Sequence, residues 1–152
     1  MNLEELAEEI FNNDTLSKAV LLWNKDRQTA IDNFGDINTW NVGQVTNMNN
    51  LFYDEKKFND DINNWNVSKV ESMDYMFAHA YKFNKPLEKW NVSSVKSMKG
   101  MFYHATNFDQ SLNSWNVSNV VNMKGMFFGT KKFNQPLNKW DMRKVISMSY
   151  MF

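Results

Sequence analysis

The chain has 152 residues, in which 17 Lys and Arg balance 17 Asp and Glu, 43% of residues are hydrophobic and cysteine is absent. These values allow one compact domain or one short repeat array, and they exclude a disulfide framework, a zinc–thiolate site and a cysteine nucleophile. The balanced charge argues against a general nucleic-acid binder, and no apolar run reaches the ~18 residues that a membrane span needs.

The N-terminal segment, residues 1–33, is predicted to be a helical cap. Apolar residues at helical spacing predict one helix over residues 2–11 and a second from about Leu16 to Asn33. Thr15 would cap the second helix, and Gly35 would end it. Such a cap covers the core and backbone edge that the first unit of a stacked repeat would otherwise expose. The acidic, amphipathic start is unlike a signal peptide, so we expect none.

The rest of the chain, residues 34–152, is a tandem repeat. Tryptophan recurs every 25 residues, at Trp40, Trp65, Trp90, Trp115 and Trp140. The first of the five units is degenerate, and the fifth stops mid-unit. Eight columns stay apolar, represented in the third unit by Phe83, Leu87, Trp90, Val92, Val95, Met98, Met101 and Phe102. One unit cannot cover its own apolar face, so the pattern predicts one continuous stack with a shared core.

Within each unit, the pattern L-x-x-W-x-V predicts a short strand, around residues 89–93 in the third unit. Strands at equivalent places would pair in parallel, about 4.8 Å apart. Ser93 then begins a short helical segment that carries Val95, Met98, Met101 and Phe102. A loop over residues 103–107 completes the unit, which predicts an α/β repeat.

The repeated unit FNxxLxxWNVSxVxxMxxMF resembles the 25- to 26-residue repeat of bacterial surface proteins in the BspA-like leucine-rich-repeat group, of the mycoplasma and listeria type. Its L-x-x-W-x-V segment is similar to the L-x-x-L-x-L strand of leucine-rich repeats, with Trp in a core leucine column. The resemblance implies an α/β repeat solenoid: a right-handed coil with short parallel strands and short helices. It also implies a role in binding or adhesion at a cell surface, without catalytic residues. We expect no lipidation cysteine or wall anchor in this chain, and the localisation stays open.

The five repeat tryptophans are predicted to form a structural core ladder beneath the strands, because they alternate with polar positions. The alternative is an exposed ladder of indoles on which sugars would stack. Each buried indole N–H would need a hydrogen-bond partner.

The residues on either side of each tryptophan would point to solvent if the strand prediction holds. One column is nearly always Asn, which favours mutual support between units through stacked amides. The other column varies on a constant scaffold, which is typical of a ligand face. The candidate ligand face is Thr39, Asn41, Asn64, Asn66, Lys89, Asn91, Ser114, Asn116, Lys139 and Asp141.

Neither a catalytic site nor a metal site is evident. His79 and His104 lie one repeat apart without constant acidic companions, so a solvated loop is the favoured interpretation. No nucleophile, phosphate-binding or zinc-protease motif occurs. We therefore expect no catalytic residue, no metal and no cofactor, and a protein that is not an enzyme.

Charge is unevenly divided along the chain. Residues 1–81 carry 14 acidic and 6 basic side chains, whereas residues 82–152 carry 3 acidic and 11 basic ones. The leading hypothesis is a non-catalytic binding or adhesion protein with a protein partner, and no nucleic acid. The alternative is a building block of a surface layer, filament or virus particle, with head-to-tail self-association through the C-terminal end.

Overall fold

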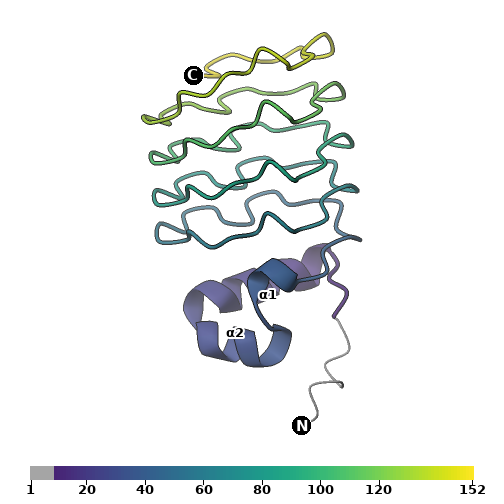
Figure 1. The fold of residues 1–152 in the computed structure, drawn as a ribbon, viewed down its shortest axis with the longest axis vertical. Helices are drawn as coiled ribbons and strands as arrows, with labels where there is room; N and C mark the ends of the chain where they lie inside the picture. The colour runs from purple at the N-terminus through teal and green to yellow at the C-terminus, as the bar shows by residue number, and fades with distance from the viewer. Residues whose placement is uncertain (1–8) are drawn as a thin grey trace.

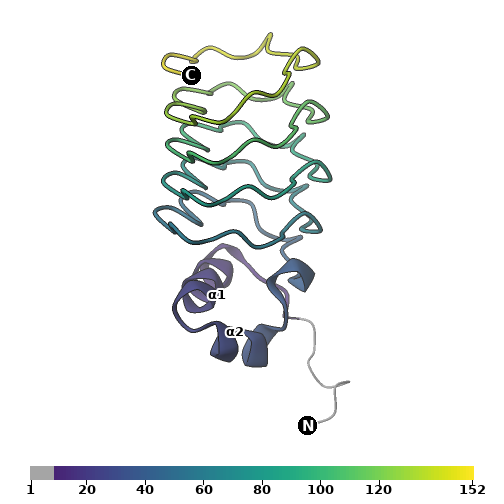
Figure 2. The ribbon, with the colours of Figure 1, turned by 60° about the vertical axis from the view of Figure 1, so that its left-hand side comes forward.

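The computed structural model describes residues 9–152, which form a helical end and a stack of coils (Figure 1). The helical end contains α1 (Asn13–Lys25), α2 (Arg27–Phe34) and the short 3₁₀ helix η1 (Ile37–Thr39). The repeats follow as coils 1 to 5, defined as residues 34–57, 58–82, 83–107, 108–132 and 133–152. Each coil lies on the one before it, and the C-terminus is at the end opposite the helices (Figures 1 and 2).

The helices begin and end where short polar side chains cap them. Asn12 accepts a hydrogen bond from the Thr15 backbone N–H, and the Thr15 hydroxyl accepts one from the Asn12 N–H, which is a capping box at the start of α1. Asp26 closes α1 by donating its N–H to the Leu22 carbonyl and caps α2 by accepting from the Thr29 N–H. Gly35, with φ 73°, ends α2 in a conformation that suits glycine.

The predicted helix from Leu16 to Asn33 is therefore two helices, because Asp26 ends one and begins the next. The predicted helix over residues 2–11 falls mostly outside the described residues. Its last three positions, residues 9–11, are not helical.

The predicted α/β solenoid of the leucine-rich-repeat type is wrong. Across residues 9–152 no segment forms a strand, and coils 2 to 5 are built from consecutive turns instead of strands and short helices. Parallel pairing between coils is reduced to isolated bridges in one column, which runs through Asn47, Ser72, Ser97, Asn122 and Ser147. In coil 3 the bridge residue, Ser97, lies four residues after the end of the predicted strand.

The backbone hydrogen bonds explain why no strand forms. In coil 1 the N–H groups of Asn50, Phe52 and Asp54 donate to carbonyls of coil 2, at distances of 2.8–2.9 Å. The N–H groups between them, those of Leu51 and Tyr53, donate to carbonyls three residues earlier in their own coil. Alternate residues thus serve the neighbouring coil and the local turn. Positive φ values of 59° at Asn50 and 60° at Asp54 accompany the turns, so the chain is not extended there.

A turn also replaces the strand predicted around residues 89–93. The Leu87 carbonyl accepts the Trp90 backbone N–H at 3.1 Å, which bends the chain. The same carbonyl accepts the Trp115 indole N–H at 2.9 Å. A side chain of the next coil thus satisfies a group that a strand ladder would have paired with backbone.

The core consists of aromatic columns that run along the stack. Phe52, Phe77, Phe102 and Phe127 lie one above another, with ring centroids 5.4, 5.5 and 5.7 Å apart and nearly parallel planes. A second phenylalanine column, Phe58, Phe83, Phe108 and Phe133, packs beside it. Because each ring contacts the coils before and after its own, the core is continuous along the molecule.

Candidate functional site

The five repeat tryptophans lie inside the stack, with exposed fractions between 2% and 8%. Four of the indoles donate to a carbonyl of the preceding coil, at 2.7–2.9 Å. Trp40, in coil 1, donates to the Gly35 carbonyl at 3.1 Å. None of these rings offers a free face, so stacking of sugars on the tryptophans is incompatible with the structure.

The variable column beside the tryptophans is exposed in every coil: Thr39, Asn64, Lys89, Ser114 and Lys139. In coils 2, 3 and 5 its backbone is held by an amide side chain of the preceding coil. The Asn63 Oδ1 atom accepts the Lys89 N–H at 3.1 Å, and Asn113 Oδ1 accepts the Lys139 N–H at 3.0 Å. The side chains of this column therefore vary, while hydrogen bonds to the preceding coil hold the backbone that carries them.

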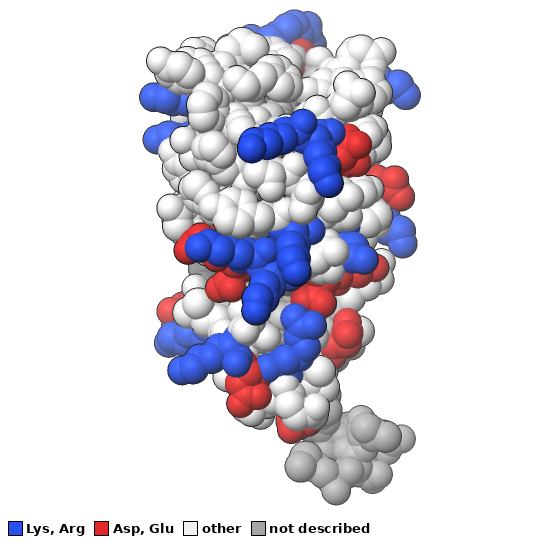
Figure 3. Space-filling view, turned by 90° about the vertical axis from the view of Figure 1, so that its left-hand side faces the viewer, with Lys and Arg blue, Asp and Glu red and all other residues white. Residues whose placement is uncertain are grey.

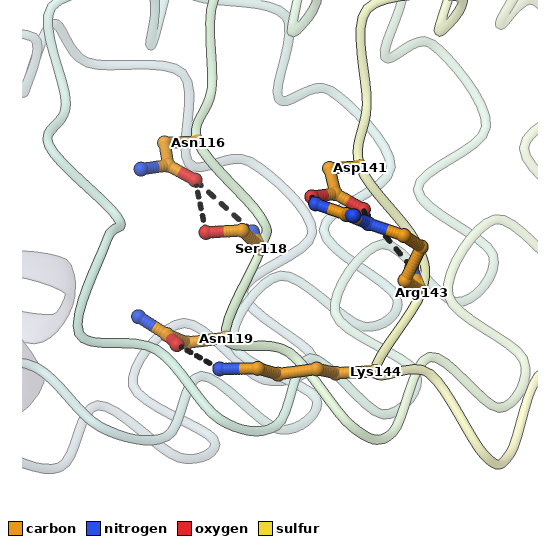
Figure 4. A network of polar contacts seen from close by, with 6 residues as sticks. All are labelled: Asn116, Ser118, Asn119, Asp141, Arg143 and Lys144. Carbon is orange, nitrogen blue, oxygen red and sulfur yellow. Dashed lines mark hydrogen bonds and ion pairs between the residues drawn. The ribbon is translucent and has the colours of Figure 1, made fainter.

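The neighbouring column, Asn41, Asn66, Asn91, Asn116 and Asp141, does not form an amide ladder. Each side chain accepts the backbone N–H two residues later in its own coil, at 3.0–3.2 Å. Figure 4 shows this turn at Asn116, whose Oδ1 also accepts the Ser118 hydroxyl. The column is exposed or half-buried, and its first role is to shape the turn after the tryptophan.

A further column of Asn and Asp side chains links successive coils, and we did not predict it from the sequence. Asn59 Oδ1 accepts the Asn84 N–H, Asn84 Oδ1 accepts the Asp109 N–H, and Asp109 Oδ1 accepts the Asn134 N–H, all at 2.9–3.0 Å. The signal was the residue after the first phenylalanine of units 2 to 5, which is Asn or Asp each time; in the first unit it is Gly35. The Asn134 N–H, followed by the Gln135 amide, holds the pKa of Asp109 below its usual value.

Several charged side chains lie close together at the coil 5 end of the candidate face. Arg143 donates from Nε and Nη2 to the two carboxylate oxygens of Asp141, at 2.9 and 2.7 Å (Figure 4). This bond, with the Arg143 backbone N–H, lowers the pKa of Asp141 to about 2. Beside it, Lys144 Nζ donates to Asn119 Oδ1 at 2.9 Å. The Lys139 ammonium has no ion-pair partner among the described residues, so it is free to meet an acidic group.

The two histidines stack on each other at the edge of the coils. The rings of His79 and His104 are 5.3 Å apart and nearly parallel, and the Tyr81 hydroxyl lies 3.4 Å from His79 Nδ1. Over residues 9–152 no cluster of three or more His, Asp or Glu residues could hold a metal ion. The same part of the chain has no helix that is long and apolar enough to cross a bilayer.

The strongest contact between the helical end and the coils is made by Asp60. Its carboxylate accepts the Trp23 indole N–H at 3.0 Å and two bonds from the Arg27 guanidinium at 3.2 and 2.8 Å. The guanidinium also lies over the Trp23 ring, 4.7 Å from its centroid. Burial, followed by the nearby Asp54, raises the pKa of Glu55.

Comparison with known protein families identifies the family to which the repeats belong. The family described as "Mycoplasma protein of unknown function, DUF285" matches residues 21–127 and again residues 90–152. The chain belongs to this family. No curated protein and no solved structure matches it.

Proposed function

We propose that this member of the DUF285 family is a non-catalytic binding module of a repeat surface protein, and that it presents the candidate face to a protein partner. The observation that supports this proposal is that the candidate face combines a constant backbone with a variable column of exposed side chains. In coils 2, 3 and 5 the backbone of the face is held in the same way, by an amide of the preceding coil, while the exposed column on it changes from Thr39 to Lys139. The resemblance to bacterial surface-protein repeats supports the adhesion role.

The face is suited to a polar partner with acidic groups. Lys89 and Lys139 are its exposed cations, and Lys89 Nζ makes only a 3.4 Å contact with Asn64 Oδ1. A backbone that is already ordered lowers the entropy cost of association. Charges at the rim of an interface mainly accelerate encounter and set specificity, so binding should weaken as salt increases.

Capture of a partner by matched variants tests the proposal. The purified chain, the double variant Lys89→Glu/Lys139→Glu and the control Lys57→Glu/Lys132→Glu are immobilised and exposed to the same surface-protein extract. The control changes two lysines that are exposed outside the candidate face. Loss of a captured protein with the face variant alone, at unchanged melting temperature, supports the proposal. Equal capture by all three proteins, or loss with the control too, contradicts it.

The uneven charge favours a second candidate, end-to-end assembly of copies. The half of the chain that includes the helical end has a net charge of −8, and the other half has +8. Figure 3 shows acidic side chains gathered in the lower part of the molecule, although lysines and arginines are mixed among them. Light scattering at low and high salt tests this candidate. Particles that grow at low salt and dissociate at high salt support assembly, because exposed charges are screened over about 8 Å at physiological salt.

A further inference from the structure

A hollow of about 170 Å³ opens on the surface of coils 2 to 5, and none of its lining residues belongs to the candidate face. Its lining residues are Tyr75, Gly100, Tyr103, Lys124, Gly125, Phe128 and Tyr150. In sequence order the hollow follows the bridge column of each coil, whereas the candidate face precedes it. The sequence analysis did not identify these residues as a set.

Two glycines at the same position of consecutive coils create the hollow. One column holds Tyr75 in coil 2 and Tyr150 in coil 5, but Gly100 and Gly125 in the two coils between them. The Tyr75 ring fills the space that a side chain at Gly100 would need. At Gly125 the nearest side-chain atom to the same space is 3.8 Å away, on Tyr103, so this part stays open.

The walls are aromatic and carry free hydroxyl groups. Tyr103 and Phe128 stack with their ring centroids 5.3 Å apart, and the Tyr150 ring lies edge-on, 6.3 Å from Phe128. Tyr150 is 72% exposed. No residue of the described chain makes a hydrogen bond to the phenolic hydroxyls of Tyr75, Tyr103 or Tyr150.

The residues that line the hollow carry positive charge, although the Asp74 carboxylate lies nearby and accepts the Lys99 backbone N–H at 2.9 Å. Lys124 lines the hollow, and Lys99 Nζ lies 5.6 Å from the centroid of the Tyr75 ring. No carboxylate is among the lining residues, and neither lysine forms an ion pair within residues 9–152. An anionic ligand would therefore gain an attraction here, and a cationic ligand would be repelled.

We infer that this hollow binds one ring of an acidic saccharide, such as a sialic acid or uronic acid residue. A cavity of about 150 Å³ holds benzene, so the space accepts one six-membered ring. The slightly positive C–H groups of a sugar ring suit the negative face of an aromatic ring, and the phenolic hydroxyls can bond the sugar hydroxyls. The ligand carboxylate would meet Lys124, which lines the hollow.

The shape favours a saccharide over single-stranded nucleic acid. Nucleic-acid channels combine a basic groove along the backbone with aromatic rings for successive bases. Here the rings surround a single hollow, and only one lysine, Lys124, lines it. The inference goes beyond the proposed function, because it concerns another set of residues and a different ligand class.

Titration of the full chain tests the inference. The probes are 3′-sialyllactose, lactose as its neutral counterpart, and a short oligothymidylate, and binding is measured by calorimetry and by the NMR signals of the sugar. We expect a dissociation constant of about 1 mM for sialyllactose and binding of lactose weaker by about tenfold or more. Glucuronic acid should compete for the same site.

Matched variants locate the binding. Tyr150→Ala and Lys124→Glu should each weaken sialyllactose binding by about tenfold or more. Tyr53→Ala and Lys131→Glu, which change exposed residues outside the hollow, should leave it unchanged. Melting temperatures equal to that of the parent chain show that the variants are folded.

Three outcomes would overturn the inference: no binding of the acidic sugars at 10 mM probe (about ten times the expected dissociation constant), equal binding of lactose and sialyllactose, or oligothymidylate binding that Tyr150→Ala and Lys124→Glu abolish. Sialyllactose binding unaffected by those two variants would also overturn it. The variant Lys89→Glu/Lys139→Glu should bind the sugar normally, so failure of the protein-binding proposal and failure of this one are distinguishable.

Discussion

The helical end and the coils are stabilised in different ways. In α1 and α2 the backbone hydrogen bonds and the caps join residues within one turn of each other, as at Asn12 and Asp26. In the coils, the N–H groups of residues such as Asn50 and Phe52 bond residues 24 positions away in the next coil. A helix here can be understood from its local sequence, whereas a coil has its structure only because its neighbours have the same one.

The two regions meet at coil 1. Phe11, Trp23 and Phe34 lie around Trp40, with ring centroids 5.1, 5.7 and 5.8 Å from it. The helical end thereby covers the aromatic core that the first coil would expose. Changes inside the coils should thus affect the whole stack, and changes at the junction should affect one end of it.

The largest expected effect is the loss of a ring from the phenylalanine column. Phe77→Ala removes contacts with Phe52, Phe102 and Phe83, so we expect the free energy of unfolding to fall by about 3–5 kcal/mol. Urea unfolding followed by circular dichroism measures it. Tyr81→Ala, which changes a ring that is 38% exposed, is the control and should cost less than about 1 kcal/mol. Similar losses for both variants would contradict a core shared between coils.

The next effect concerns the indole hydrogen bonds between coils. Trp90→Phe removes the indole donor from the Ile62 carbonyl, which then keeps only the Trp65 backbone N–H, and it puts a smaller ring in the core. Together these changes should destabilise the protein by about 1–3 kcal/mol. Val121→Ala, at a 38% exposed position, is the control and should change stability by less than about 0.5 kcal/mol. A Trp90→Phe variant as stable as the parent would show that water replaces the indole there.

A smaller effect is expected at the junction. Asp60→Ala removes the acceptor shared by Trp23 and Arg27, and should cost about 1–2 kcal/mol because the Asp60 side chain is only 25% exposed. Asp14→Ala removes an ion pair with Lys18 whose side chains are both about three-quarters exposed, and should cost less than about 0.5 kcal/mol. Hydrogen exchange measures where the chain opens. In Asp60→Ala we expect faster exchange in α1 and α2 but not in coil 4, because a change at the junction should affect only that end. Uniformly faster exchange along the chain would contradict this expectation.

The smallest effect is the pH dependence at coil 5. The pKa of Asp141 is lowered from 3.8 to about 2 by the bond from Arg143. A lowered pKa in the folded state stabilises the protein above the unfolded value, and this stabilisation is lost as pH falls from about 4 to about 2. Asp141→Asn should therefore flatten the melting temperature slightly over that window. An unchanged pH profile would show that solvent screens the pair.

The repeat pattern alone predicted part of the candidate face and core. Alternation around Trp90 placed Lys89 and Asn91 at the surface and the indole in the interior, where the structure has them. The same alternation led to the wrong prediction of a strand. Period-two burial needs only successive side chains on opposite sides of the chain, and a series of turns bonded to the next coil achieves this without extended backbone.

By itself, the sequence determined the 25-residue period, the apolar columns and the order of a helical segment followed by repeats. Only the tertiary structure decided which backbone groups pair between coils, which amides link them, and that Gly100 and Gly125 leave a hollow beside Tyr75 and Tyr150. The physical reason is the distance along the chain. Burial follows from each residue's own polarity, whereas hydrogen bonds across 24 to 28 residues and open space beside a glycine depend on how neighbouring coils lie against each other.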